Sequence, residues 1–174
     1  MPPPGVLENR RFLRVAFISL AIVLAAAWLL GPVRYVEVLD RDSGEKYFAQ
    51  PVQEGDLVRL SWVHSIEHTP WVEMYRVSNG QLALKESRIK SFGAGVDQVA
   101  PEVAHRNGWV ILRGTERIFP ALHLIYSREA AYDLRIAGRT LDLQERIPHH
   151  AAIRVGVKQS SRALWWFERD TRGG

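Results

Sequence analysis

The first hydrophobic feature of the chain is an uncharged run of 19 residues from Val15 to Val33. At about 1.5 Å per residue, a helix of this length spans roughly 28 Å, which is close to the hydrocarbon thickness of a bilayer. The pair Gly31–Pro32 predicts the end of this helix. The expected organisation is a cytoplasmic N-terminal segment at 1–14, a transmembrane anchor at 15–33, an exported β domain at 34–160 and a C-terminal tail at 161–174.

The charges before the apolar run predict its orientation. Arg10, Arg11 and Arg14 precede it, and only Glu8 offsets them. Because positive residues stay on the cytoplasmic side, we expect the N-terminus inside, the following domain outside, and membrane lipid as a partner of the anchor. A cleaved signal peptide is the alternative, since the small residues 25–27 offer a cleavage site.

After the apolar run, the pattern changes to short stretches with alternating polar and apolar residues, separated by Gly, Pro and Asn. Leu57–His64 is the clearest of these. Val72–Val77 and Leu82–Leu84 flank Asn79–Gly80, a pair typical of β-hairpin turns. Further strands are expected at 35–39, 46–49, 88–91, 109–112, 121–127, 132–136, 140–143 and 153–157. This pattern predicts a mostly β fold, an antiparallel β-sandwich or small barrel preceded by one N-terminal transmembrane helix.

Two segments are ambiguous in the sequence. Gln98–His105 fits a short turn of helix, and Ala163–Phe167 fits either a helix or a strand. The second segment carries two adjacent tryptophans and a phenylalanine. These rings either cap the core or contact the membrane surface or a partner, because aromatic side chains favour half-hydrated positions.

Composition excludes several classes of function. The net charge is +4, but the basic residues are scattered among acidic ones, without the Lys/Arg-rich run of a nucleic-acid-binding protein. The chain has no cysteine, which excludes thiol nucleophiles, disulfides and thiolate metal sites. We therefore expect no nucleic-acid partner.

The densest group of polar and aromatic residues lies between positions 62 and 75. If the chain reverses around 67–70, alternation places Trp62 and His64 on the same face as Trp71, Glu73 and Tyr75. We then expect His64 and Glu73 to lie opposite each other and to hydrogen-bond across the hairpin. A carboxylate in that position would orient the imidazole for proton transfer.

Three interpretations of this region remain open: a structural pair at a sheet end, a rim that binds a ligand or partner, and a hydrolytic site. Ser65 directly follows His64, so on a regular strand it points to the other face, which is unfavourable for a nucleophile and its base. A metal site from His64, His68 and an acid does not match a known ligand spacing. We expect no catalytic residue, no metal and no cofactor.

A second distinctive segment, Ser91–Gly95, places two glycines around an alanine. Such a segment allows a sharp bend or a close backbone approach, whereas a phosphate loop would require a following helix. The candidate ligand- or partner-binding residues are His64, Ser65, Glu67, Trp71, Glu73, Phe92, Gly93 and Gly95.

These motifs carry a resemblance to a known family. The pattern Trp-x-His-Ser-x-Glu at 62–67, followed by Thr-Pro-Trp-x-Glu-x-Tyr at 69–75 and Ser-Phe-Gly-Ala-Gly at 91–95, resembles the bacterial domain-of-unknown-function family 1850. The similarity covers roughly residues 35–143. Members have no established activity. Their genes resemble genes that accompany those of TAXI-type tripartite ATP-independent periplasmic (TRAP) transporters, which import organic acids.

The resemblance implies an accessory protein in the bacterial inner membrane, with its domain on the periplasmic side and TRAP transporter components as partners. Combined with the residue patterns, it favours a non-catalytic, single-pass accessory protein of unknown molecular activity. The alternative is a hydrolase that uses His64 with Glu67 or Glu73.

Overall fold

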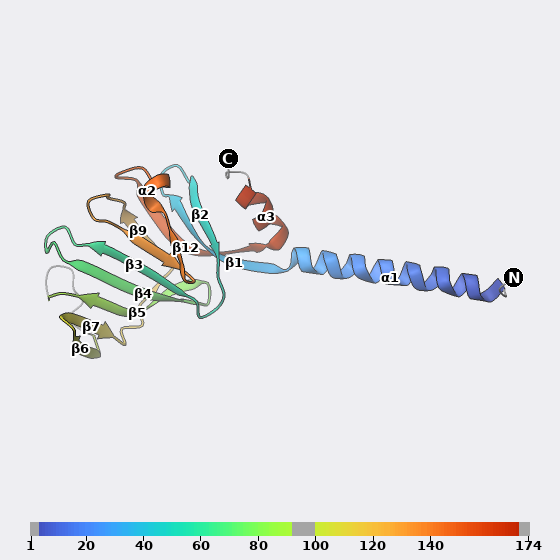
Figure 1. The fold of residues 1–174 in the computed structure, drawn as a ribbon, viewed down its shortest axis with the longest axis horizontal. Coiled ribbons are helices and arrows are strands. Elements are labelled where there is room, and N and C mark those ends of the chain that lie inside the picture. The colour runs from blue at the N-terminus through green and yellow to red at the C-terminus, as the bar shows by residue number, and fades with distance from the viewer. Residues whose placement is uncertain (1–3, 92–99, 171–174) are drawn as a thin grey trace. The chain divides into compact units, whose positions relative to one another are not determined.

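The structure is a computed structural model that describes residues 4–91 and 100–170 (Figure 1). It divides into two compact units, one formed by Met1–Val33 with Ser160–Gly174 and the other by Arg34–Gln159. The first unit contains helix α1 (Pro4–Leu30), which ends directly before Gly31–Pro32, as expected. Within α1, Leu13–Leu30 is long and apolar enough to cross a membrane, a property that a signal sequence shares.

The remaining elements, in chain order, are β1 (Pro32–Asp40), β2 (Lys46–Pro51), β3 (Leu57–Val63), β4 (Pro70–Ser78), β5 (Gln81–Ile89), β6 (Glu102–Arg106), β7 (Trp109–Arg113), β8 (Ile118–Phe119), β9 (Ala121–Ile125), β10 (Asp133–Ile136), β11 (Arg139–Leu141), α2 (Leu143–Arg146), β12 (Ala152–Ser161) and α3 (Arg162–Asp170). The smaller sheet has the order β2-β1-β12-β9. The larger sheet has the order β11-β10-β3-β4-β5-β7-β6, and β8 pairs with β5.

The hydrophobic core lies between these two sheets, whose facing arrangement is visible in Figure 1. In β3, Val58 and Leu60 are buried in the core, whereas Arg59 between them pairs with Asp133 on the opposite face. In β12, Ile153 and Val155 bring the smaller sheet to the same core. The expectation of a mostly β, antiparallel fold with one N-terminal apolar helix is therefore confirmed.

A partly buried ion pair joins the two central strands of the smaller sheet. Arg154 of β12 donates to the carboxylate of Glu37 in β1 over 3.1 Å, and Glu37 is only 4% exposed. Because a charge buried this deeply is unfavourable without a partner, the guanidinium of Arg154 is necessary for this arrangement.

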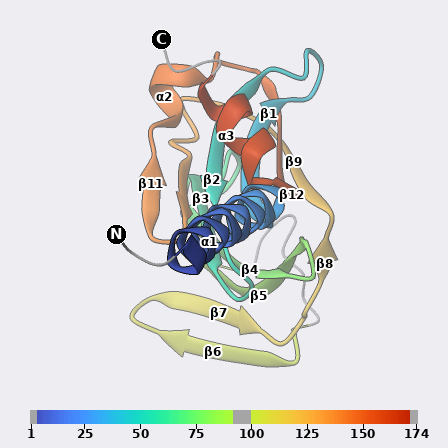
Figure 2. The ribbon, with the colours of Figure 1, turned by 90° about the vertical axis from the view of Figure 1, so that its right-hand side faces the viewer.

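The structure resolves both ambiguous segments. The expectation of a short turn of helix at Gln98–His105 is wrong for the described residues of that segment. Glu102–Arg106 instead forms β6, which pairs with β7 as a ribbon at the edge of the larger sheet (Figure 2). The second segment is helical and forms part of α3. The hairpin expected at Asn79–Gly80 is confirmed, and both residues have a positive φ, of 49° and 75°.

Candidate functional site

The hairpin of β3 and β4 carries most of the candidate residues. In its register, Leu60 lies opposite Glu73 and Trp62 lies opposite Trp71. Residues directly opposite each other in an antiparallel pair point to the same face. The prediction that the two tryptophans and Glu73 share one face is therefore confirmed.

The predicted hydrogen bond between His64 and Glu73 is wrong. The backbone N–H of His64 donates to the carbonyl of Thr69 over 2.9 Å, so Thr69 is its partner across the hairpin. Glu73 lies opposite Leu60, four residues before His64, which separates the two positions by about 13 Å along the strand. The reversal is centred between Ile66 and Glu67, two residues earlier than the sequence interpretation assumed, and this displaces the pairing partner by four residues.

The turn between the strands holds the ring of His64 in place. The backbone N–H of Glu67 donates to Nδ1 of His64 over 3.2 Å, and the N–H of His68 donates to the carbonyl of His64 over 2.9 Å. His68 has a φ of 50°, in the left-handed region that closes the turn. The imidazole of His64 stacks on the indole of Trp71, with 4.7 Å between centroids and 18° between planes.

At this end of the hairpin, two buried polar atoms have no hydrogen-bond partner. Trp71 is 7% exposed and packs with Ile89, Val110 and Leu112, yet its Nε1–H meets no acceptor. The buried hydroxyl of Thr69, two residues earlier in the chain, is also unpartnered. Each buried group without a hydrogen bond lowers the stability of the fold by about 1–3 kcal/mol relative to a hydrogen-bonded state. Both groups can still donate a hydrogen bond to a ligand.

Glu73 lies deeper on the same face. The hydroxyl of Tyr75 donates to its carboxylate. Burial raises the pKa of Glu73, whereas the bond from Tyr75 and the charge of Arg117 oppose that shift. Burial also raises the pKa of Tyr75 and that of Tyr132, with the negative charge of Glu73 as a second cause in both cases.

Aromatic rings connect the two ends of this face. The ring of Tyr132 stacks on Trp62 with 6.2 Å between centroids, and Trp62 lies 5.7 Å from Trp71. Sequence reasoning placed Tyr132 in a strand but did not assign it to the site. Its involvement depends on the pairing of β10 with β3, between residues more than 70 positions apart, for which the sequence carries no local signal.

The other candidate residues have different surroundings. Ser65 is exposed in the turn. Ser91 Oγ lies 3.5 Å from a carboxylate oxygen of Glu67, which brings the start of the second distinctive segment next to the first motif. Three further candidates, Phe92, Gly93 and Gly95, lie outside the described residues.

This geometry supports binding better than hydrolysis. Nδ1 of His64 already accepts a backbone hydrogen bond, and Glu73 is about 13 Å from His64 along the strand, so the carboxylate of Glu73 does not orient the imidazole as a general base. Among the described residues, no group of three or more His, Asp or Glu side chains is placed to hold a metal ion. The groups that this site offers to a ligand are the unpaired hydrogen-bond donors of Thr69 and Trp71 and the aromatic rings beside them.

Comparison with known families is consistent with the sequence resemblance. Residues 58–143 match the model of the Domain of unknown function (DUF1850), and this match supports the assignment of that segment to the family. The segment begins in β3, ends at the first residue of α2, and contains the β3–β4 hairpin. No curated protein and no solved structure matches the chain significantly.

Proposed function

We propose that the chain is a single-pass, membrane-anchored accessory protein whose exported β domain binds the carboxylate of an organic acid, or a partner's carboxylate, at the end of the β3–β4 hairpin. We name His64, Thr69 and Trp71 the hairpin-end site. The observation that carries the proposal is the pair of buried donors at this site, the hydroxyl of Thr69 and the Nε1–H of Trp71, neither of which has an acceptor.

The chemistry of these donors favours an anionic acceptor. A carboxylate accepts several hydrogen bonds, and bonds to a charged group contribute about 1.5–3 kcal/mol each. Because both donors are covered, binding requires a displacement of the turn that carries His64 above Trp71. Removing two unpaired buried groups offsets the cost of that displacement.

The proposed location and partner are supported by the sequence. The span Leu13–Leu30 has the length and composition of a membrane anchor, and Arg10, Arg11 and Arg14 before it favour an inside N-terminus. The resemblance to family 1850 supports a bacterial inner membrane, a periplasmic β domain and an accessory role at a TAXI-type TRAP transporter of organic acids. That transport system supplies the carboxylate ligands for which the donors are suited.

Calorimetric titration of the full-length protein in nanodiscs with a panel of mono- and dicarboxylic acids tests the proposal. Thr69→Val and Trp71→Phe each remove one donor while keeping a similar side-chain shape. Each variant should bind the acid roughly 10-fold more weakly or worse, while its free energy of unfolding changes by no more than about 1 kcal/mol. Thr140→Val, at an exposed position in β11, is the matched control and should bind like the wild type.

Two outcomes would contradict the proposal: no acid binds, or both donor variants bind as tightly as the wild type. Co-purification with TRAP transporter components tests the partner separately. Hydrolysis of an ester or peptide by the wild type, lost in His64→Ala, would instead support the hydrolase alternative.

A further inference from the structure

The C-terminal helix α3 exposes large apolar side chains. Among the described side chains of this nine-residue helix, Leu164 is 56% exposed and Trp166 is 44% exposed. Large exposed apolar side chains on a short helix are unfavourable in water and typical of a surface that contacts another phase or molecule.

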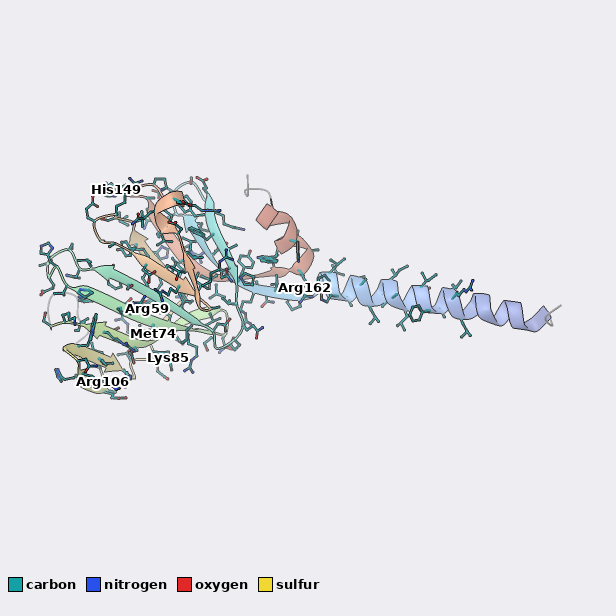
Figure 3. All side chains as sticks on the ribbon, in the orientation of Figure 1. Arg59, Met74, Lys85, Arg106, His149 and Arg162 are labelled. Atoms are coloured by element: carbon teal, nitrogen blue, oxygen red, sulfur yellow. The ribbon has the colours of Figure 1, made fainter. Side chains whose placement is uncertain are left out.

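Arg162, the first residue of α3, connects this helix to the end of α1. Its backbone N–H donates to the carbonyl of Gly31 over 2.9 Å, and its Nη1 donates to the carbonyl of Trp28 over 2.6 Å. The guanidinium also lies over the indole of Trp28, 4.6 Å from its centroid. Figure 3 shows Arg162 at the end of α1.

These contacts have a clear physical cause. Trp28 lies in the last turn of α1, where backbone carbonyls have no partner within the helix and a positive charge is favourable. The carbonyl of Trp28 accepts from the N–H of Gly31 over 3.2 Å, and Arg162 donates a second hydrogen bond to it and adds a cation–π contact. Its position is therefore fixed by both the backbone and the ring at the end of α1.

The contacts also fix the depth of α3 relative to the apolar span. Trp28 lies two residues before the end of the span at Leu30, a distance of about 3 Å along the helix axis. An arginine at such a position keeps its charged group at the membrane–water boundary, and tryptophan rings favour the same region. If α1 spans a bilayer, the start of α3 therefore lies at the depth of the lipid headgroups that surround the end of α1.

We propose that α3 is an interfacial helix that inserts Leu164 and Trp166 into the headgroup region of the leaflet from which α1 emerges. This inference rests on the proposed membrane anchoring. An isolated helix of nine residues is only marginally stable in water and would bind a membrane weakly. Here the anchor and Arg162 hold α3 beside the lipid, so insertion is an intramolecular step and a small apolar area suffices.

Depth-dependent fluorescence quenching tests the location of α3. Because the chain has no cysteine, single cysteines at Trp166→Cys, Ile22→Cys and Thr140→Cys can each carry an NBD probe in the full-length protein in nanodiscs. Lipids brominated near the headgroup should quench the probe at position 166 most strongly, at a depth of about 5–10 Å. Lipids brominated deep in the acyl chains should quench the probe at 22, and neither lipid should quench the probe at 140.

The probes at the three positions distinguish a failure of the membrane anchoring from a failure of the interfacial helix. An unquenched probe at 22 would show that the anchoring itself is wrong. A quenched probe at 22 with an unquenched probe at 166 would overturn the interfacial helix while leaving the anchor intact. A probe at 166 that is blue-shifted but not quenched would mean that protein covers α3, which also overturns the inference.

A second comparison tests the role of Arg162. Arg162→Gln removes the guanidinium fork and its charge, so headgroup-level quenching at position 166 should fall while quenching at 22 is unchanged. Arg106→Gln, at an exposed position in β6, is the control and should alter neither signal. Unchanged quenching at 166 in Arg162→Gln would overturn the positioning role of Arg162. Circular dichroism verifies that the β domain of each variant is folded.

Discussion

Trp71 combines a well-packed ring with a buried N–H group that has no acceptor. Trp71→Ala should lower the free energy of unfolding by about 3–5 kcal/mol, because it leaves a large cavity. Trp71→Phe should change it by only about 1 kcal/mol, because the lost ring area is offset by removal of an unpaired donor. Urea denaturation of both variants measures this contrast. An equal loss in both would indicate that the N–H contributes a hydrogen bond.

Glu73 predicts a pH dependence of stability. Burial raises its pKa above the ordinary value of 4.5, so the folded protein retains a proton that the unfolded chain has already released. The stabilising contribution is therefore fully present below pH 4.5 and decreases as the pH rises through the raised pKa. Glu73→Gln stays neutral, and its free energy of unfolding relative to the wild type should increase with pH above 4.5, as denaturation at several pH values would show.

Glu116→Gln is the matched control for this experiment, with the opposite sign. The side-chain bond from Lys85 lowers the pKa of Glu116, so its contribution is present above its ordinary pKa and lost as the pH falls. Its replacement should therefore become more costly, not less, as the pH rises from acid to neutral. A pH-independent difference for Glu73→Gln would contradict the burial of an ionisable group at position 73.

At the scale of elements, the ion pair of Glu37 and Arg154 links the neighbouring strands β1 and β12 around a buried carboxylate. Arg154→Met should lower the free energy of unfolding by about 3–5 kcal/mol, because it leaves the carboxylate of Glu37 buried without a partner. The double variant Glu37→Met/Arg154→Met should recover much of that loss, since no unpaired charge remains. Additive losses in the double variant, measured by denaturation, would contradict this interpretation.

The existence of most elements could be predicted from the sequence. Alternation located β3, where Leu57–His64 was expected and Leu57–Val63 is observed, and Asn79–Gly80 located the turn of β4 and β5. Local signals of this kind act over a few residues, and both the turn chemistry and the strand pattern pointed to the same structure.

Register and long-range neighbours could not be predicted in the same way. The loop between β3 and β4 has no Asn-Gly pair or comparable signal, so the sequence did not define the centre of the loop. The observed centre lies two residues earlier than expected, and this difference places Glu73 opposite Leu60 and not opposite His64. The contact of Tyr132 with Trp62, and that of Arg162 with Trp28, join segments far apart in the chain. These contacts follow from tertiary packing, which periodicity does not encode.

At the scale of the whole molecule, the β domain should fold without the apolar helix. Arg34–Gln159 forms a compact unit that contains the hydrophobic core between the two sheets. A fragment of residues 34–159 should therefore be soluble and unfold in one cooperative transition, visible by circular dichroism. A fragment that is molten or insoluble would show that α1 or α3 contributes essential contacts.

The last prediction distinguishes a membrane anchor from a cleaved signal sequence. Leu13–Leu30 meets the requirements of both, since each needs an apolar N-terminal helix. The span is longer than the usual apolar segment of a signal peptide, and Trp28–Leu30 continues it beyond the small residues at 25–27. We therefore expect the mature protein to keep its N-terminus and to remain in the membrane pellet after an alkaline carbonate wash.

A reporter fused after Gly174 should be active only outside the cytoplasm, because Arg10, Arg11 and Arg14 retain the N-terminus inside. Replacing these three arginines with glutamate should reduce the exported fraction, whereas the same change at three exposed arginines of the β domain should not. N-terminal sequencing of the mature protein decides between the alternatives. A first residue at Trp28 would contradict the anchor, since the residual apolar segment of three residues is far too short to hold the domain at a bilayer.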